Sequence, residues 1–226
     1  MSTRTKVAVV VAAPLVLAAA GLVHPLSLTT PTAPMWAHLH VALLPVFPLL
    51  ALGFVVPLWQ RPGRGVAGVA VVVAWLAAFT YACFYTGLDA VAGIAAGTAW
   101  RDAPPGVDRE SIVGPLYRMG DALGAFGVRA FLLAVVATCV ALYPRAGIRV
   151  LPGGLVLLVA GWSFLDSHVF RPRGVLTMLG IAVGFALLTA LTAERRRAPA
   201  AATPYGSRTP RRDRRRRAVR SLRWRA

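Results

Sequence analysis

The chain has 226 residues, of which 57% are hydrophobic, and a formal net charge of +17. This composition excludes an ordinary soluble domain, since several runs reach the roughly 20 apolar residues that a membrane-spanning helix needs. The charge does not indicate a nucleic-acid-binding domain, because residues 194–226 alone carry 13 Arg against two acids. Most of the positive charge therefore belongs to a C-terminal tail.

The first 193 residues contain the apolar segments. We predict an all-α, polytopic membrane bundle of six transmembrane helices over residues 1–193, and a mostly disordered, Arg-rich cytoplasmic tail over 194–226. The six expected helices cover residues 7–23, 37–58, 66–90, 122–143, 150–169 and 174–193. The stretch 97–121, which mixes basic and acidic residues, is expected to be a loop.

The second segment has marked ends and breaks. Trp36 and Trp59 bracket it, as expected of interfacial anchors. Pro45, Pro48 and Pro57 lie within it, and each removes a backbone donor, so we expect kinks.

The basic residues between segments predict the orientation. They precede the first segment and follow the second, the fourth and the sixth, as Arg4, Lys6, Arg61, Arg64, Arg145, Arg149 and the tail. By the positive-inside rule both termini are cytoplasmic, in a cell inner (plasma) membrane. Arg171 and Arg173 oppose this rule and are expected to snorkel. A cleaved signal peptide over residues 1–20 stays open as an alternative.

A row of polar and small residues recurs at four-residue spacing in the third segment. It consists of Tyr81, Tyr85, Asp89, Gly93 and Gly97. Residues four apart share a helix face, and a GxxxG pair lets another helix approach closely. We therefore expect this row to face the interior of the bundle.

Asp89 is an ionisable side chain within an apolar run, which is costly and normally requires a partner or a water-filled cavity. The expected partner is Arg129 on the fourth segment. A register-fixing ion pair, snorkelling of both side chains, and a ligand-, ion- or proton-handling role all remain open.

All four histidines fall on the extracytoplasmic side of this topology. They are His24, His38, His40 and His168, and Asp166 lies near the last. Imidazole suits Zn, Cu or Fe, and Asp89 or Asp166 would add a carboxylate. However, no metal-binding spacing occurs, and His38 and His40 point apart on a helix. We therefore expect neither a metal nor a cofactor, while a metal site, or a haem held between His38 or His40 and His168, stays open.

Covalent catalysis has weak support. Ser163, Asp166 and His168 resemble a nucleophile set, but Ser163 and His168 lie five residues apart on one segment and are poorly aligned. We assign no catalytic residue.

The expected partners are lipids. Anionic headgroups attract basic residues that adjoin a membrane, so the tail is expected to adhere to the bilayer surface. Other membrane proteins are further candidate partners, whereas sequence-specific nucleic-acid binding is not expected.

Three stretches, "WAHLHVALLPVFPLLALG", "FYTGLDAVAGIAAG" and "DSHVFRPRG", together resemble a family of small multi-pass bacterial membrane proteins without assigned activity. The resemblance covers about residues 20–190 and implies a six-helix body but no functional residues. The leading hypothesis is a non-enzymatic structural or accessory protein held together by Asp89 and Arg129. The alternatives are a small-molecule or ion-binding protein, such as a transporter, and a haem or metal redox protein.

Overall fold

The computed structural model describes residues 1–59 and 63–193, which form helices joined by short connections, with no strand among them. They belong to one compact unit, Met1–Ala193. The predicted disordered tail lies outside the described residues. The helices in chain order are α1 (Thr3–Val23), α2 (Ala33–Leu43), the 3-10 helix η1 (Phe47–Ala51), α3 (Leu52–Leu58), α4 (Gly65–Leu88), the π-helix η2 (Asp89–Ala95), α5 (Ala96–Asp102), α6 (Arg109–Ala146), the 3-10 helix η3 (Gly147–Val150), α7 (Leu151–Ser167) and α8 (Arg173–Leu191).

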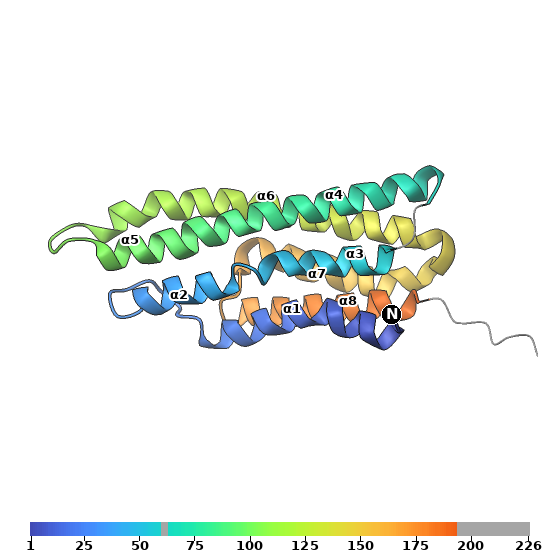
Figure 1. Cartoon of the computed structure of the whole chain (residues 1–226), viewed down its shortest axis with the longest axis horizontal. Coiled ribbons are helices and arrows are strands. Elements are labelled where there is room, and N and C mark those ends of the chain that lie inside the picture. Colours follow the sequence, from blue (N-terminus) through green and yellow to red (C-terminus); the bar gives the residue numbers. More distant parts are fainter. Residues whose placement is uncertain (60–62, 194–226) are drawn as a thin grey trace, which may run out of the picture. The chain divides into compact units, whose positions relative to one another are not determined.

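Five helical stretches within the described ranges are long and apolar enough to cross a membrane. They are Thr3–Val23, Ala33–Leu58, Gly65–Asp102, Arg109–Ser167 and Arg173–Leu191. The fourth stretch contains α6, η3 and α7, and the chain turns back at η3 (Figure 1). The predicted all-α class with several apolar helices is confirmed, whereas the count of six membrane crossings stays a prediction.

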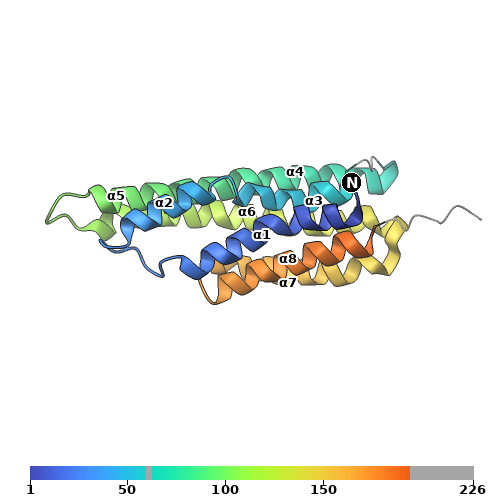
Figure 2. The ribbon, with the colours of Figure 1, turned by 60° about the horizontal axis from the view of Figure 1, so that its bottom comes forward.

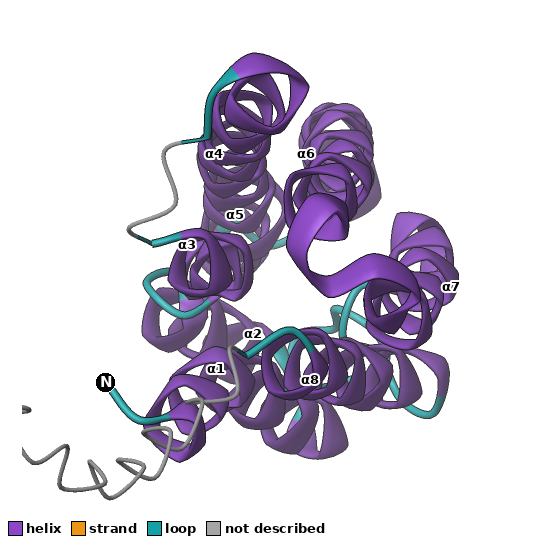
Figure 3. Ribbon diagram, turned by 90° about the vertical axis from the view of Figure 1, so that its right-hand side faces the viewer, coloured by secondary structure: helices purple, strands orange, loops and turns teal. Residues whose placement is uncertain are grey.

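The long helices surround an aromatic interior. Viewed along the bundle, α1, α8, α7, α6, α4 and α3 follow one another, and each contacts the next around the closed ring (Figure 3). Phe54 lies inside, with its ring centroid 5.0 Å from that of Phe131 and 5.2 Å from that of Phe185. Tyr81 and Phe164 continue this core, and both are buried.

Large apolar side chains also cover the outside of the bundle. Leu76, Phe79, Val159 and Leu176 are each more than 60% exposed, and they come from α4, α7 and α8. A soluble protein rarely exposes large contiguous apolar patches, whereas a surface in contact with lipid does so at no cost. The outer surface is therefore typical of a membrane protein.

The helices α2 and α5 and the start of α6 extend beyond the ends of α1 and α7 (Figures 1 and 2). The prediction of a loop over 97–121 is wrong, because α5 continues to Asp102 and α6 already begins at Arg109. Hydropathy locates apolar spans rather than helix ends, and charged residues fit the exposed side of a helix. The actual break is at 103–108, where Pro104 and Pro105 lead into Gly106 at φ 82°.

The proline-rich second segment is interrupted as expected. The α-helix α2 ends at Leu43. The chain then forms the 3-10 helix η1, which contains Pro48, and returns to α-helix as α3. The Tyr81 hydroxyl donates a hydrogen bond to the Phe47 carbonyl oxygen at 3.2 Å, which satisfies a backbone acceptor in this irregular region. The break lets α2 bend away from α3 toward α5.

Glycines allow α2 to lie directly against η2 and α5. A Cβ atom added to Gly93 would overlap the His40 imidazole, and one added to Gly97 would lie 3.0 Å from Trp36 Cδ1. The predicted close approach of another helix at this glycine pair is confirmed, and that helix is α2. As a consequence, His40 is pressed against the helix that carries Asp89.

Candidate functional site

Four residues from separate elements meet where α1 and α7 end. His24 follows α1, His40 lies on α2, Asp89 begins η2, and His168 follows α7. The ring centroid of His40 is 5.0 Å from that of His24 and 6.1 Å from that of His168. We call these four residues the histidine cluster.

Asp89 is the acid of the cluster and is completely buried. Its Oδ1 lies 3.8 Å from His40 Nε2, which is too long for a hydrogen bond. Among the described residues, neither carboxylate oxygen has a hydrogen-bond partner. A buried carboxylate without compensation is costly, so its environment points to a ligand or to a proton. Asp89 also begins a π-helix, a geometry that often occurs at functional sites.

Backbone carbonyls fix two of the imidazoles. His40 Nδ1 donates a hydrogen bond to the Trp36 carbonyl at 2.7 Å, and His24 Nδ1 donates to the Pro25 carbonyl at 2.7 Å. A carbonyl oxygen can only accept, so the proton of each neutral ring resides on Nδ1. The Nε2 atom of each ring therefore keeps its lone pair.

His168 is held by Tyr85. The Tyr85 hydroxyl and His168 Nδ1 are 2.6 Å apart, and Tyr85 is buried. The backbone of His168 adopts φ 42°, a left-handed conformation that is unusual for a residue other than glycine. Such strain is maintained only when the surroundings determine the position of the residue.

Burial favours the neutral form of the two histidines that lie just outside the apolar helices. It lowers the pKa of His168 well below its ordinary value, and repulsion from His40 and His24 lowers it further. It also lowers the pKa of His24, against the hydrogen bond to Pro25, which raises it. Neutral imidazole is the form that binds metal ions.

Two cavities adjoin the cluster. One of about 500 Å³ is lined by His40, His168, Trp36 and Tyr117 among others. The second, of about 430 Å³, is lined by Tyr85 and again by His168. His168 thus lines both cavities, which gives a small ligand room to reach the cluster.

The structure separates three predicted residues from this cluster. Arg129 is exposed, and no ion pair joins it to the buried Asp89 among the described residues. The proposed Asp89–Arg129 pair is therefore wrong, because the Arg129 side chain is exposed whereas Asp89 is buried beside His40. His38 is exposed because it points away from His40 on α2, and Asp166 is exposed and pairs with Arg173 at 3.4 Å.

The predicted polar row faces the interior. Tyr81, Tyr85, Asp89, Gly93 and Gly97 are all buried. The four-residue spacing predicted this face correctly, and Gly93 and Gly97 remain on it although the π-helix begins at Asp89.

Two further residues contribute to the site without having been predicted. Trp36, expected as an interfacial anchor, is 5% exposed and packs on His24 with ring centroids 4.9 Å apart, whereas Trp59 is 62% exposed. Asp121 on α6 lines both cavities. Asp121 was not predicted as a site residue because residues 97–121 were expected to form a loop, whereas Asp121 lies on α6.

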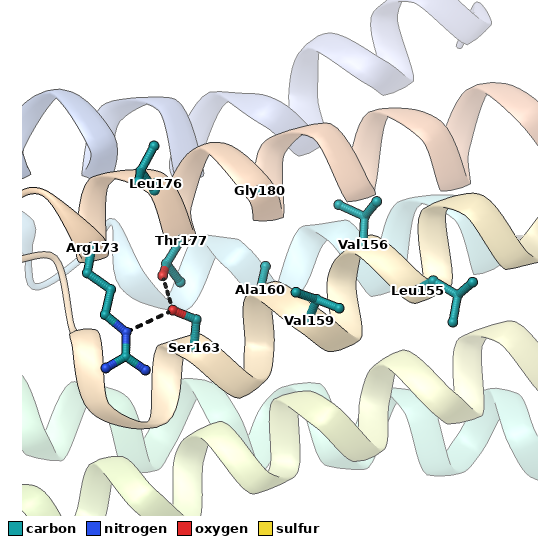
Figure 4. Close-up of a pocket in the computed structure, with 9 residues that line it drawn as sticks. All are labelled: Leu155, Val156, Val159, Ala160, Ser163, Arg173, Leu176, Thr177 and Gly180. Atoms are coloured by element: carbon teal, nitrogen blue, oxygen red, sulfur yellow. Dashed lines mark hydrogen bonds between the residues drawn. The ribbon is translucent and has the colours of Figure 1, made fainter.

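A separate groove of about 490 Å³ lies between α7 and α8 (Figure 4). Its polar end holds Ser163, which is hydrogen-bonded to Thr177 at 2.8 Å, and Arg173. Ser163 thus bonds to Thr177 while His168 bonds to Tyr85, so no nucleophile set forms from Ser163 and His168. The remainder of the groove is apolar.

The chain matches no family model, no curated protein and no solved structure. The resemblance to small multi-pass bacterial membrane proteins stays a prediction.

Proposed function

We propose that this chain is a multi-pass protein of the inner (plasma) membrane that binds a cation in the histidine cluster. The observation that carries the proposal is Asp89, whose buried carboxylate has no hydrogen-bond partner among the described residues and faces a histidine. A bound cation would compensate this charge, and an acid at membrane depth normally has a compensating partner or a water-filled cavity. The two adjoining cavities supply room for entry.

The arrangement favours this role over a purely structural one. A structural ion pair needs a partner for Asp89, and the expected partner, Arg129, is exposed. If Asp89 binds a cation rather than pairing with Arg129, replacing Asp89 should leave the fold of the helix bundle intact.

The orientation supports an extracytoplasmic site. The connections at 24–32, 103–108 and 168–172 all lie toward the end of the bundle that is opposite the N-terminus and η3 (Figure 1). The end with the N-terminus and η3 carries Arg4, Lys6 and Arg149, and α8 ends there before the 13 Arg of residues 194–226. The positive-inside rule therefore favours the cytoplasm for this end, although the opposite end carries Arg101, Arg109, Arg171 and Arg173. The cation would therefore enter from outside the cell.

The test is thermal unfolding of the purified protein in detergent. Wild type and Asp89→Asn are each heated with Na⁺, K⁺, Mg²⁺, Ca²⁺, Zn²⁺ and a set of small organic cations. We expect at least one cation to raise the Tm of wild type and not that of Asp89→Asn, because a ligand that binds only the folded state stabilises it. Asp166→Asn, which changes an exposed acid, is the matched control and should respond like wild type. If no cation gives an Asp89-dependent shift, the proposal is wrong.

A further inference from the structure

The ligand atoms of three residues converge in the histidine cluster. Those of His40, Asp89 and His168 all lie within 4.8 Å of one another. Zinc binds imidazole nitrogen and carboxylate oxygen at about 2.0–2.2 Å in tetrahedral geometry, so two ligand atoms on one ion are about 3.4 Å apart. A small inward movement of the side chains would therefore bring all three atoms to coordination distance.

The partners of these residues orient them as metal ligands. A histidine that binds a metal commonly donates its other ring N–H to a backbone carbonyl, which fixes its tautomer. His40 does this through the Trp36 carbonyl, and its Nε2 faces Asp89 at 3.8 Å. The orientation of His40 is thus set before any ion arrives.

His168 has an equivalent outer partner. Tyr85 occupies its Nδ1, which leaves Nε2 as the free ring nitrogen. A tyrosine hydroxyl can accept a hydrogen bond, so the tautomer with a proton on Nδ1 is available and gives Nε2 a lone pair. Tyr85 is therefore a positioning residue for His168.

We propose that His40, His168 and Asp89 together bind a divalent transition-metal ion such as Zn²⁺ or Fe²⁺. The proposal rests on the cation site proposed above and names its ligand class. Two imidazoles and one carboxylate suit zinc, iron, cobalt or nickel, whereas Mg²⁺ and Ca²⁺ prefer oxygen ligands alone. Three protein ligands leave a coordination position for water or a further ligand.

His24 is the nearest additional ligand. Its Nε2 is buried and has no hydrogen-bond partner among the described residues, and its ring centroid is 6.4 Å from that of His168. His24 lies next to the three proposed ligands but is not one of them. Replacing His24 should therefore weaken metal binding less than replacing His40.

The test is metal titration of the full-length protein, purified in detergent and stripped with a chelator. Zn²⁺ content is measured by elemental analysis, and Co²⁺ binding by its visible absorption. We expect one equivalent per chain in wild type. Loss of an outer partner alone costs about 10–100-fold in affinity, so His40→Gln, His168→Gln and Asp89→Asn should each weaken binding by about 100-fold or more. Tyr85→Phe should weaken it by roughly 10-fold.

His38→Gln is the matched control, since His38 is exposed on the same helix as His40. It should bind as wild type does, and a metal-free unfolding curve for every variant verifies folding. If wild type binds no stoichiometric Zn²⁺ or Co²⁺, or if His38→Gln weakens binding as much as His40→Gln, the metal site is overturned. If Na⁺, K⁺ or an organic cation nevertheless gives an Asp89-dependent Tm shift, the cation site survives and only its ligand class is wrong.

Discussion

Asp89 is a single buried residue that we expect to lower the stability of the folded protein. Its carboxylate is buried, and His40 Nε2 at 3.8 Å offers only a weak contact. An unsatisfied buried polar group costs about 1–3 kcal/mol, and more when it is charged. Such a group is retained when something other than stability requires it.

At this scale we predict the effect of Asp89→Asn in the absence of added metal. The variant should be at least as stable as wild type, by up to about 3 kcal/mol at a pH where Asp89 is ionised, because it replaces a buried acid without cutting a hydrogen bond. The measurement is chemical denaturation in detergent. A loss of about 3–5 kcal/mol would instead mark Asp89 as half of a structural ion pair.

A double-mutant cycle separates the two candidate neighbours of Asp89. Asp89→Asn combined with Arg129→Gln should be additive within about 0.5 kcal/mol, because the exposed arginine does not contact the carboxylate. Asp89→Asn combined with His40→Gln should give a coupling energy of about 0.5–3 kcal/mol. Coupling to Arg129 and none to His40 would contradict the described geometry.

At the scale of elements, the site depends on α2 packing against η2. The proline-rich break between α2 and α3 lets α2 bend, and Gly93 lets the imidazole of His40 approach the backbone. The row of residues from Tyr81 to Gly97 was predictable because helical spacing determines which residues share a face. The π-helix at Asp89 and the choice of α2 as neighbour were not, since neither has a periodic pattern in the sequence.

We predict that Gly93→Ala displaces His40. The added methyl group would occupy the space of the imidazole, so the variant should lose about 1–3 kcal/mol of stability and also bind cations more weakly. Denaturation and metal titration measure the two effects. Gly114→Ala on α6 is the control, because its nearest neighbour is the Arg118 guanidinium at 3.5 Å, and it should be neutral or slightly stabilising. Equal behaviour of the two variants would refute the role of Gly93.

At the scale of the whole molecule, the long helices exceed the thickness of a membrane. The stretch Gly65–Asp102 has 38 residues, which at about 1.5 Å per residue is roughly 57 Å. The hydrocarbon core is about 30 Å thick. Part of this stretch must lie outside the membrane, and the charged residues Arg101 and Asp102 indicate that α5 belongs to that part.

The topology predicts opposite labelling of two turns. In a variant with Cys83→Ala and Cys139→Ala, a membrane-impermeant maleimide applied to spheroplasts should label Val107→Cys but not Ile148→Cys, because the first turn is expected outside and η3 inside. Both side chains are exposed, so accessibility is not limiting. Lysed cells provide the control, in which both sites should react. Labelling of Ile148→Cys in sealed spheroplasts would contradict the predicted orientation, in which η3 faces the cytoplasm.

The sequence alone determined that this is a helical protein of membrane character, and that Tyr81, Tyr85 and Asp89 face inward. Apolar length and helical spacing are local properties, so they can be read along the chain. Only the tertiary structure decided that His40 and His168 meet at Asp89, with His24 beside them, while Arg129 and His38 are exposed. The spacing of residues places a side chain on its own helix, but the order of helices around the bundle, the bend of α2 and the end of α7 determine which side chains face each other.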